Sequence, residues 1–277
     1  MTSVLITGTS KGIGLESALA FGRAGHRVHA TMRKPSQAPL MAETAAREKL
    51  PITVSSLDAD SDQSVSDGIG RILKDHGPID VLVNNAGVER VGSVEEVPLA
   101  DFRSVMETNY FGAIRCIQAL VPHMRQRRSG CIINVTSVAG RTAGPPMAPY
   151  TASKWALEAL SEALAGEMKL FNVRVAILEP GIIDTAMAQR IADRASDSPY
   201  PPGAFCRFIL VRPEESGSAC AGRTEDCGNR GEWDVAAPPP RRTRRCSTTA
   251  MAQSNDRRTM GRPPCRRRRN LVPRHGA

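Results

Sequence analysis

Three residues in the second half of the chain have the types and spacing needed for acid–base chemistry on a carbonyl group. Tyr150 and Lys154 lie four residues apart in the run YTASK, and Ser137 stands thirteen residues before it. A tyrosine with its ordinary pKa near ~10 is a poor acid or base at neutral pH, but an adjacent ammonium is expected to lower that pKa. Tyr150 would then act as general acid or base, with the Ser137 hydroxyl binding the reacting oxygen. The alternative is a plain tyrosine–lysine pair on a helix surface.

Two glycine-containing turns have the composition of a site for a phosphate-bearing ligand. The run TGTSKGIG, Thr7–Gly14, follows a short apolar segment and precedes a helical pattern, and NNAG, Asn84–Gly87, ends another apolar segment. Gly8, Gly12 and Gly14 permit a tight turn and close backbone approach to a phosphate at a helix N-terminus. The spacing GxxxGxG differs from the more usual GxGxxG, so a plain strand-to-helix turn remains the alternative for the first run. An ordinary turn is the alternative for the second.

Alternating hydrophobic periods predict the elements that position these residues. Apolar strand segments lie at 4–7, 28–32, 52–57, 79–83, 131–136 and 173–178, and helical patterns lie at 14–25, 38–49, 62–74, 99–125 and 149–170. Six strands separated by helices imply right-handed crossovers and a single α/β domain with a doubly wound parallel sheet. Continuously apolar runs such as CIINV and VRVAIL are typical of strands that are buried on both faces.

Composition divides the chain into two parts. Residues 1–204 carry 21 basic and 21 acidic residues, whereas residues 205–277 carry 16 arginines and seven acidic residues, and therefore the whole net charge of +9. No apolar run is long enough for a membrane helix, and the N-terminus lacks the pattern of a signal peptide, so we expect a cytoplasmic protein without membrane partners. Five of the seven cysteines lie in the second part without CxxC spacing, so we expect neither a disulfide framework nor a metal site.

The order of these motifs resembles that of the short-chain dehydrogenase/reductase family, over about residues 1–190. The resemblance implies a Rossmann-like fold and hydride transfer between a nicotinamide and a carbonyl or secondary alcohol. It further implies that Tyr150 is the acid or base, that Lys154 lowers its pKa and binds the nicotinamide ribose, and that Ser137 binds the substrate oxygen. Asn109 would hold a water of the proton relay. The implied cofactor-binding residues are Gly8, Ser10, Lys11, Gly12, Ile13, Gly14, Arg33, Asp58, Asn85, Ala86, Gly87, Tyr150, Lys154, Pro180, Gly181, Ile183 and Thr185.

Charge near the second strand favours NADP(H) over NAD(H). NAD sites commonly place an acidic residue at the end of that strand, but here the sequence reads HATMRKP, with Arg33 and Lys34. Arginine binds a phosphate dianion well, and Lys11 in the glycine loop adds positive charge. A solvated surface lysine is an equal alternative for Lys34. The family resemblance implies a small-molecule carbonyl or alcohol as substrate. The run SVAGRTAGPPMAPYTASKWALEALSEAL is similar to the 17β-hydroxysteroid and retinol dehydrogenase branch, and also to many bacterial reductases of unassigned substrate. A homo-oligomer is also expected.

Residues 205–277 depart from the family pattern. They are rich in Arg, Pro, Gly and Cys, with runs such as APPPRRTRRC that cannot form a core, and we interpret this segment as a disordered tail. Frame-shifted reading of a GC-rich coding sequence would give this composition, and a genuine added tail is the alternative. Because the family's lid and last strand are not recognised here, two other functions remain open: an NADP-binding protein with impaired catalysis, or polyanion binding through the arginines. Nucleic-acid binding is disfavoured, because few aromatic residues accompany those arginines.

Overall fold

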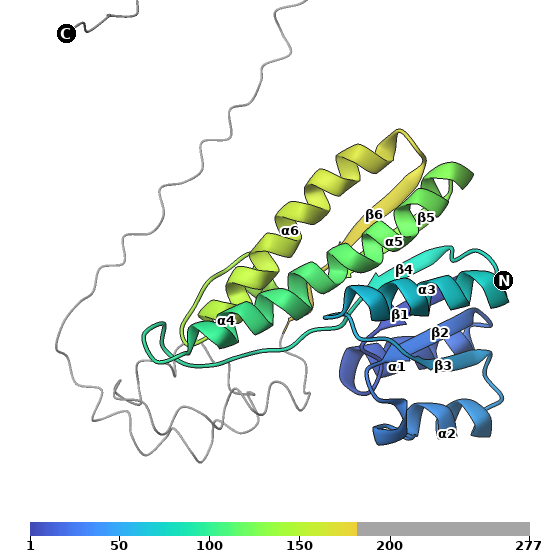
Figure 1. Ribbon diagram of the computed structural model, residues 1–277, viewed down its shortest axis with the longest axis horizontal. Helices are drawn as coiled ribbons and strands as arrows, with labels where there is room; N and C mark the ends of the chain where they lie inside the picture. The colour runs from blue at the N-terminus through green and yellow to red at the C-terminus, as the bar shows by residue number, and fades with distance from the viewer. Residues whose placement is uncertain (182–277) are drawn as a thin grey trace, which may run out of the picture. The chain divides into compact units, whose positions relative to one another are not determined.

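The computed structural model describes residues 1–181 of the chain (Figure 1). Strands and helices alternate along this part as the hydrophobic periods predict. The elements are β1 (Ser3–Thr7), α1 (Gly12–Arg23), β2 (Arg27–Met32), η1 (Pro35–Gln37), α2 (Leu40–Arg47), β3 (Ile52–Ser56), α3 (Asp62–His76), β4 (Val81–Asn84), α4 (Leu99–Met106), η2 (Glu107–Phe111), α5 (Gly112–Arg127), β5 (Gly130–Val135), η3 (Val138–Gly140), α6 (Ala148–Lys169) and β6 (Val173–Leu178).

The six strands form one parallel sheet in the order β3-β2-β1-β4-β5-β6. The chain moves outward from β1 to β3 and then returns to continue from β4 on the other side of β1. This doubly wound, Rossmann-like order confirms the predicted fold class. It also places a reversal of strand order between β1 and β4, where ligands of open α/β sheets bind beside the carboxyl ends of the strands.

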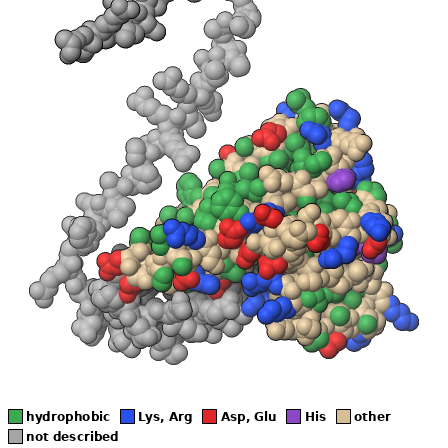
Figure 2. All heavy atoms as spheres, viewed as in Figure 1, with side chains coloured by type: hydrophobic (Ala, Val, Ile, Leu, Met, Phe, Trp, Pro, Cys, Tyr) green, Lys and Arg blue, Asp and Glu red, His purple; other side chains and the backbone are tan. Residues whose placement is uncertain are grey.

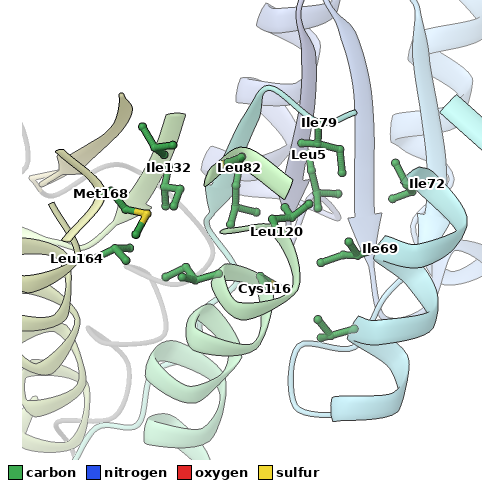
Figure 3. Close-up of a cluster of buried hydrophobic side chains, with 14 of the residues drawn as sticks. Leu5, Ile69, Ile72, Ile79, Leu82, Cys116, Leu120, Ile132, Leu164 and Met168 are labelled. Atoms are coloured by element: carbon green, nitrogen blue, oxygen red, sulfur yellow. The ribbon is translucent and has the colours of Figure 1, made fainter. Parts of the chain in front are cut away.

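Each face of the sheet carries its own hydrophobic core, because successive side chains of a strand point to opposite faces. Leu5 of β1 contributes to the core under α3, α5 and α6, where Leu82, Leu120 and Ile132 are fully buried (Figure 3). Val4 and Ile6, the neighbours of Leu5, contribute to the second core, which packs against α1 and α2. The two cores fix the sheet, and thereby the strand ends that carry the candidate site.

The predicted helix over residues 99–125 is interrupted in the structure. Its middle five residues, Glu107–Phe111, form a π-helical turn between α4 and α5. Continuous hydrophobic periodicity predicted an unbroken helix, and Glu107–Phe111 itself contains no glycine or proline, although Gly112 follows directly. The other predicted elements agree with the structure to within a few residues at their ends.

Strand β6 also differs from the sequence-based expectation of a strand buried on both faces. It lies at one edge of the sheet that residues 1–181 form, and its side chains alternate between more and less exposed positions. Arg174, Ala176 and Leu178 are exposed, because no helix among the described residues covers their side of β6. The second face of the sheet is therefore packed over β1–β3 and left open at β6 within this part of the chain.

Several predictions concern residues outside the described part, 182–277. These are the domain boundary after residue 204, the disordered tail over 205–277, and the roles of Ile183 and Thr185. All of them stay predictions.

Candidate active site

The glycine loop connects β1 to α1 at the carboxyl edge of the sheet. Gly8 and Gly12 have φ angles of 71° and 60°, in the left-handed region that side chains other than glycine rarely adopt. Helix α1 begins at Gly12, its first turn contains no acidic residue, and no side chain caps its N-terminus. The first N–H groups of α1 and the positive end of its dipole are therefore suited to a phosphate.

The loop is packed tightly against the NNAG turn that follows β4. A side chain at Gly8 would place its Cβ 2.7 Å from the Cα of Ala86, and one at Gly14 would place it 2.4 Å from the Nδ2 of Asn85. Asn85 donates hydrogen bonds from Nδ2 to the carbonyl oxygens of Thr7, at 2.8 Å, and of Gly8, at 3.1 Å. Sequence reasoning assigned the NNAG backbone to the cofactor, and the structure shows that the Asn85 side chain also holds the glycine loop.

Thr7 is a structural residue of this site that sequence reasoning missed. Its hydroxyl accepts hydrogen bonds from the backbone N–H groups of Asn85, at 3.1 Å, and of Ala86, at 3.0 Å. The hydroxyl thereby joins the ends of β1 and β4, the two strands that flank the reversal of strand order. Its position as the last residue of a strand beside a glycine turn was the available sequence signal.

Positive side chains surround the predicted adenosine end of this edge. Arg33 follows β2 and is exposed, and Lys11 is exposed in the glycine loop. Neither makes an ion pair within residues 1–181. Asp58 follows β3, where its carboxylate accepts a hydrogen bond from the N–H of Asp60 at 3.1 Å. A ligand phosphate near Arg33 would thus meet cations that have no competing carboxylate partner in the described part of the chain.

Tyr150 and Lys154 lie one turn apart on α6 and face the same edge. The Lys154 Nζ donates to the carbonyl oxygen of Val135 at 2.8 Å and lies 5.6 Å from the centroid of the Tyr150 ring. The same Nζ would be 3.7 Å from a Cβ built at Gly87, so the absence of a side chain there keeps space beside the ammonium. The YTASK run thus brings its two predicted residues together with the NNAG turn.

The pKa of each of these two groups is shifted by burial. Burial lowers the pKa of Lys154 from 10.5 to about 8, although the nearby charge of Glu158 raises it. Burial raises the pKa of Tyr150 above its ordinary 10, a hydrogen bond with Ser137 acts in the lowering direction, and the charge of Glu89 raises it. This direction is opposite to the one expected from an adjacent ammonium. Loss of water around the phenolate outweighs the other effects, and one N–H of the Lys154 ammonium is used in the hydrogen bond to Val135.

Ser137 is the second residue after β5, and its side chain forms a hydrogen bond with Tyr150. Its Oγ accepts a hydrogen bond from the N–H of Ala139 at 3.1 Å and forms the hydrogen bond with Tyr150 that acts on the tyrosine pKa. A hydroxyl and a phenol that share a hydrogen bond at the end of a parallel strand can bind one carbonyl oxygen between them.

Asn109 lies in the middle of the π-helical turn and is buried. Its side chain bonds both backbone groups of Val88, accepting from the N–H at 2.8 Å and donating to the carbonyl at 2.9 Å. It also donates to the hydroxyl of Ser153 at 2.9 Å, and that hydroxyl donates to the carbonyl oxygen of Tyr150 at 2.7 Å. Asn109 therefore joins α6 to the segment after the NNAG turn. Ser153, three residues after Tyr150, is a second residue that sequence reasoning missed.

The remaining predicted residues lie at the same edge. Ser10 and Ile13 belong to the glycine loop and the first turn of α1. Pro180 and Gly181 follow β6, and the carbonyl oxygen of Pro180 accepts a hydrogen bond from the N–H of Val138 at 3.0 Å. The loops after β1, β2, β3, β4, β5 and β6 thus carry every predicted site residue that the structure describes, apart from those in the first turn of α1, in η2 and in α6.

No helix within residues 1–181 is both long enough and apolar enough to span a membrane. In the same part of the chain, no three or more His, Cys, Asp or Glu side chains gather closely enough to hold a metal ion.

Comparison with known proteins places this geometry in a family. A family model described as short chain dehydrogenase matches residues 2–196. The oxidoreductase YusZ of Bacillus subtilis is 37% identical over 222 residues, which cover 77% of this chain and 79% of that protein. Retinol dehydrogenase 8 of Bos taurus is 40% identical over 204 residues, which cover 72% of this chain but only 64% of that protein.

The fold of this chain is also similar to that of a solved structure. The crystal structure of a gluconate 5-dehydrogenase from Burkholderia cenocepacia, in complex with NADP and tartrate, has a TM-score of 0.66 and 30% sequence identity. The match covers 69% of this chain and 75% of that one. Because the family model spans most of the chain and the motifs stand in their strand and helix contexts, this chain belongs to the short-chain dehydrogenase family and is an oxidoreductase.

Proposed function

We propose that this oxidoreductase transfers a hydride between NADP(H) and a carbonyl compound or secondary alcohol, with Tyr150 as the general acid or base. The observation that carries the proposal is the placement of Tyr150, Ser137 and Lys154 at one edge of the sheet, beside the glycine loop. A hydride acceptor in that space would have an acid, a hydroxyl and an ammonium within one small region.

In the direction of reduction, Tyr150 donates its phenolic proton to the carbonyl oxygen. Its raised pKa keeps the proton on the phenol until a substrate oxygen gains negative charge. Ser137 donates a hydrogen bond to the same oxygen and fixes its position. The buried ammonium of Lys154 stabilises the phenolate that remains. Gly87 and Lys154 would help to hold a nicotinamide, and the chemistry that this cofactor would supply is the hydride.

Asn109 holds α6, which carries Tyr150 and Lys154, in place, and it supports the reprotonation of Tyr150. Both hydrogens of its amide are used in bonds to Val88 and Ser153, so a relay water would bind its Oδ1 as a donor. That oxygen would lie 3.3 Å from a Cβ built at Gly87 and therefore faces the same space as Lys154.

The preference for NADP(H) rests on charge. Arg33 stands after β2 where an NAD site commonly has an acidic residue, and its guanidinium is exposed. Lys11, within the glycine loop, is exposed as well. The NADP-bound gluconate 5-dehydrogenase, 30% identical in sequence, is a solved relative that binds this cofactor.

The substrate is proposed to be a carbonyl compound with an apolar body, because retinol dehydrogenase 8 is 40% identical over the shared segment. The test follows the loss of NADPH absorbance with a panel of retinaldehyde, aromatic ketones, aliphatic aldehydes and keto-sugar acids. Turnover of at least one panel member by the full chain, and its loss in Tyr150→Phe, is the expected result. An enzyme that binds NADPH but reduces no member of the panel would overturn the proposed activity.

That last outcome would favour a second function, the binding of NADP(H) without turnover. The contacts that hold the glycine loop to the NNAG turn favour it, because Asn85 and Thr7 make them within residues 1–181. Calorimetric titration with NADPH separates the two functions: tight binding without reduction identifies the second.

A homo-oligomer is proposed from the exposed apolar side chains on α4–α6. Hydrophobic side chains gather over this part of the molecule in Figure 2. Leu99 of α4, Phe111 of η2 and Trp155 of α6 are exposed. Sedimentation of the full chain is expected to show a dimer or larger assembly, and a monomer at micromolar concentration would contradict the proposal.

A further inference from the structure

One arginine next to Ser137 contacts three carboxylates. Arg141 follows the short helix η3, and its guanidinium lies 2.8 Å from an oxygen of Glu158, 3.3 Å from one of Glu162 and 2.9 Å from one of Glu179. Glu158 and Glu162 belong to α6, while Glu179 directly follows β6. A single side chain thus bridges the loop after β5, the helix that carries Tyr150 and Lys154, and the segment that leads to Pro180.

The carboxylates of the three ion pairs differ in exposure, and their exposure determines which ion pair contributes most to stability. The side chain of Glu158 is 4% exposed, whereas that of Glu162 is 64% exposed. An exposed ion pair contributes little, but a buried carboxylate without a compensating charge is strongly unfavourable. Neither oxygen of Glu158 has a well-aligned hydrogen bond within residues 1–181, so its compensation comes from Arg141 and from Lys154 one turn away.

The backbone around Ser137 is tied to the same partners. Thr136 N–H donates to the carbonyl of Leu178 at 2.8 Å, and Val138 N–H donates to that of Pro180 at 3.0 Å. On the other side, a Cβ at Gly140 would lie 3.0 Å from the Cγ of Glu158, so the loop rests directly on α6. Two backbone hydrogen bonds thus hold the loop of Ser137 to the segment after β6, and the ion pairs of Arg141 add side-chain contacts to that segment and to α6.

We propose that Arg141 is a positioning residue, which holds the loop of Ser137 against α6 and against the segment after β6 through Glu158 and Glu179. It touches neither the phenol nor the ammonium and acts through the backbone that presents Ser137. Its effect on catalysis rests on the proposed function of Ser137, Tyr150 and Lys154, but its effect on the loop does not.

The loop is tested without any substrate, by hydrogen exchange of the full chain. In Arg141→Met, which keeps an apolar stem but removes the charge, exchange in the peptide over 136–142 should accelerate about tenfold or more, while that of β1 stays within about twofold. Glu162→Gln is the matched control, because it removes the exposed partner of the same arginine, and it should leave both peptides unchanged. Equal acceleration of the loop and of β1 would show a merely global loss of stability and overturn the proposal, as would no acceleration.

Catalysis is tested with NADPH and whichever panel carbonyl the wild-type enzyme reduces. Arg141→Met should lower kcat about tenfold or more, with the Kd for NADPH changed by less than about threefold, because the ion pairs of Arg141 within residues 1–181 involve no residue of the glycine loop. Arg141→Lys restores the charge but not the fork that reaches both partners, so its kcat should be intermediate. An unchanged kcat in Arg141→Met, in an otherwise active enzyme, would overturn the positioning role.

The two readouts separate this proposal from the proposed function. If the wild-type chain reduces no carbonyl while the loop exchange responds as expected, the activity proposal fails and the role of Arg141 in the loop stands. If the wild-type enzyme is active and the Arg141→Met loop exchanges normally, the role of Arg141 fails and the activity stands.

Discussion

Raising the pH through about 8 is expected to remove the proton from Lys154 and thereby to slow carbonyl reduction. The shift of the lysine pKa from 10.5 to about 8 corresponds to about 3 kcal/mol against the charged form. At one pH unit above that value, only about one lysine in ten is protonated, so kcat/KM should fall about tenfold per unit. Tyr150 keeps its proton over this range, because burial raises its pKa above 10.

The assay is kcat/KM for NADPH-dependent reduction, measured from about pH 6 to about pH 10 at constant ionic strength. The charged or titratable groups around Lys154 are Tyr150 and Glu158, with Glu89 and Arg141 beside these two. Because the charge of Glu158 raises the lysine pKa, Glu158→Gln should move the alkaline loss of activity to lower pH. Activity that stays constant to pH 10, or an identical profile in Glu158→Gln, would refute the reasoning.

Burial lowers the pKa of His29 from 6.5 to about 4, helped by the charges of His76 and Arg27, so the folded state should lose about 3 kcal/mol as pH falls from 7 to 4. The free energy of unfolding, measured with urea, should fall in this way for the wild type and not for His29→Gln. An equal dependence of that free energy on pH in the two proteins would contradict the prediction. Gly14→Ala places a Cβ 2.4 Å from the carbonyl oxygen of Gly8 and should cost about 1–3 kcal/mol and weaken NADPH binding about tenfold. The control Gly70→Ala, with no atom within 4 Å, should not destabilise the protein; similar effects of both variants would exclude the steric argument. Arg33→Asp should erase or reverse the preference for NADPH over NADH in titrations, and a wild-type protein that binds both equally would refute the role of Arg33.

The sheet and the location of the site were predictable because they depend on regular patterns. Apolar strands that alternate with amphipathic helices leave few arrangements other than a doubly wound parallel sheet. The carboxyl ends of parallel strands share one edge, so the loop of Gly8, the NNAG turn and Ser137 had to approach one another there.

The π-helical turn was not predictable, because its cause lies in distant residues. The Asn109 side chain forms hydrogen bonds with Val88 and with Ser153, which belong to two separate segments of the chain. It does so from the π-helical turn. A periodicity count sees only the local order of apolar residues, which runs without interruption through Glu107–Phe111. Turns of this type often occur at functional sites.

The direction in which the Tyr150 pKa is shifted, and the role of Arg141, depend on burial. The spacing of residues in the sequence does not predict burial. Lys154 is four residues from Tyr150 as expected, but its Nζ donates a hydrogen bond to the carbonyl oxygen of Val135, and burial raises the pKa of the phenol. Arg141 and Glu158 are 17 residues apart, and only the fold shows that one of the carboxylates near Arg141 is buried while another is exposed.

The central claim, that Tyr150 is the acid of an NADPH-dependent reduction, is tested most directly by single-turnover reduction in Tyr150→Phe. This change removes one oxygen and leaves the ring against Lys154, so NADPH should bind with a Kd within about threefold of the wild type while the rate of reduction falls about 10²–10⁴-fold. Reduction within a factor of about two of the wild-type rate, at saturating NADPH, would contradict the account.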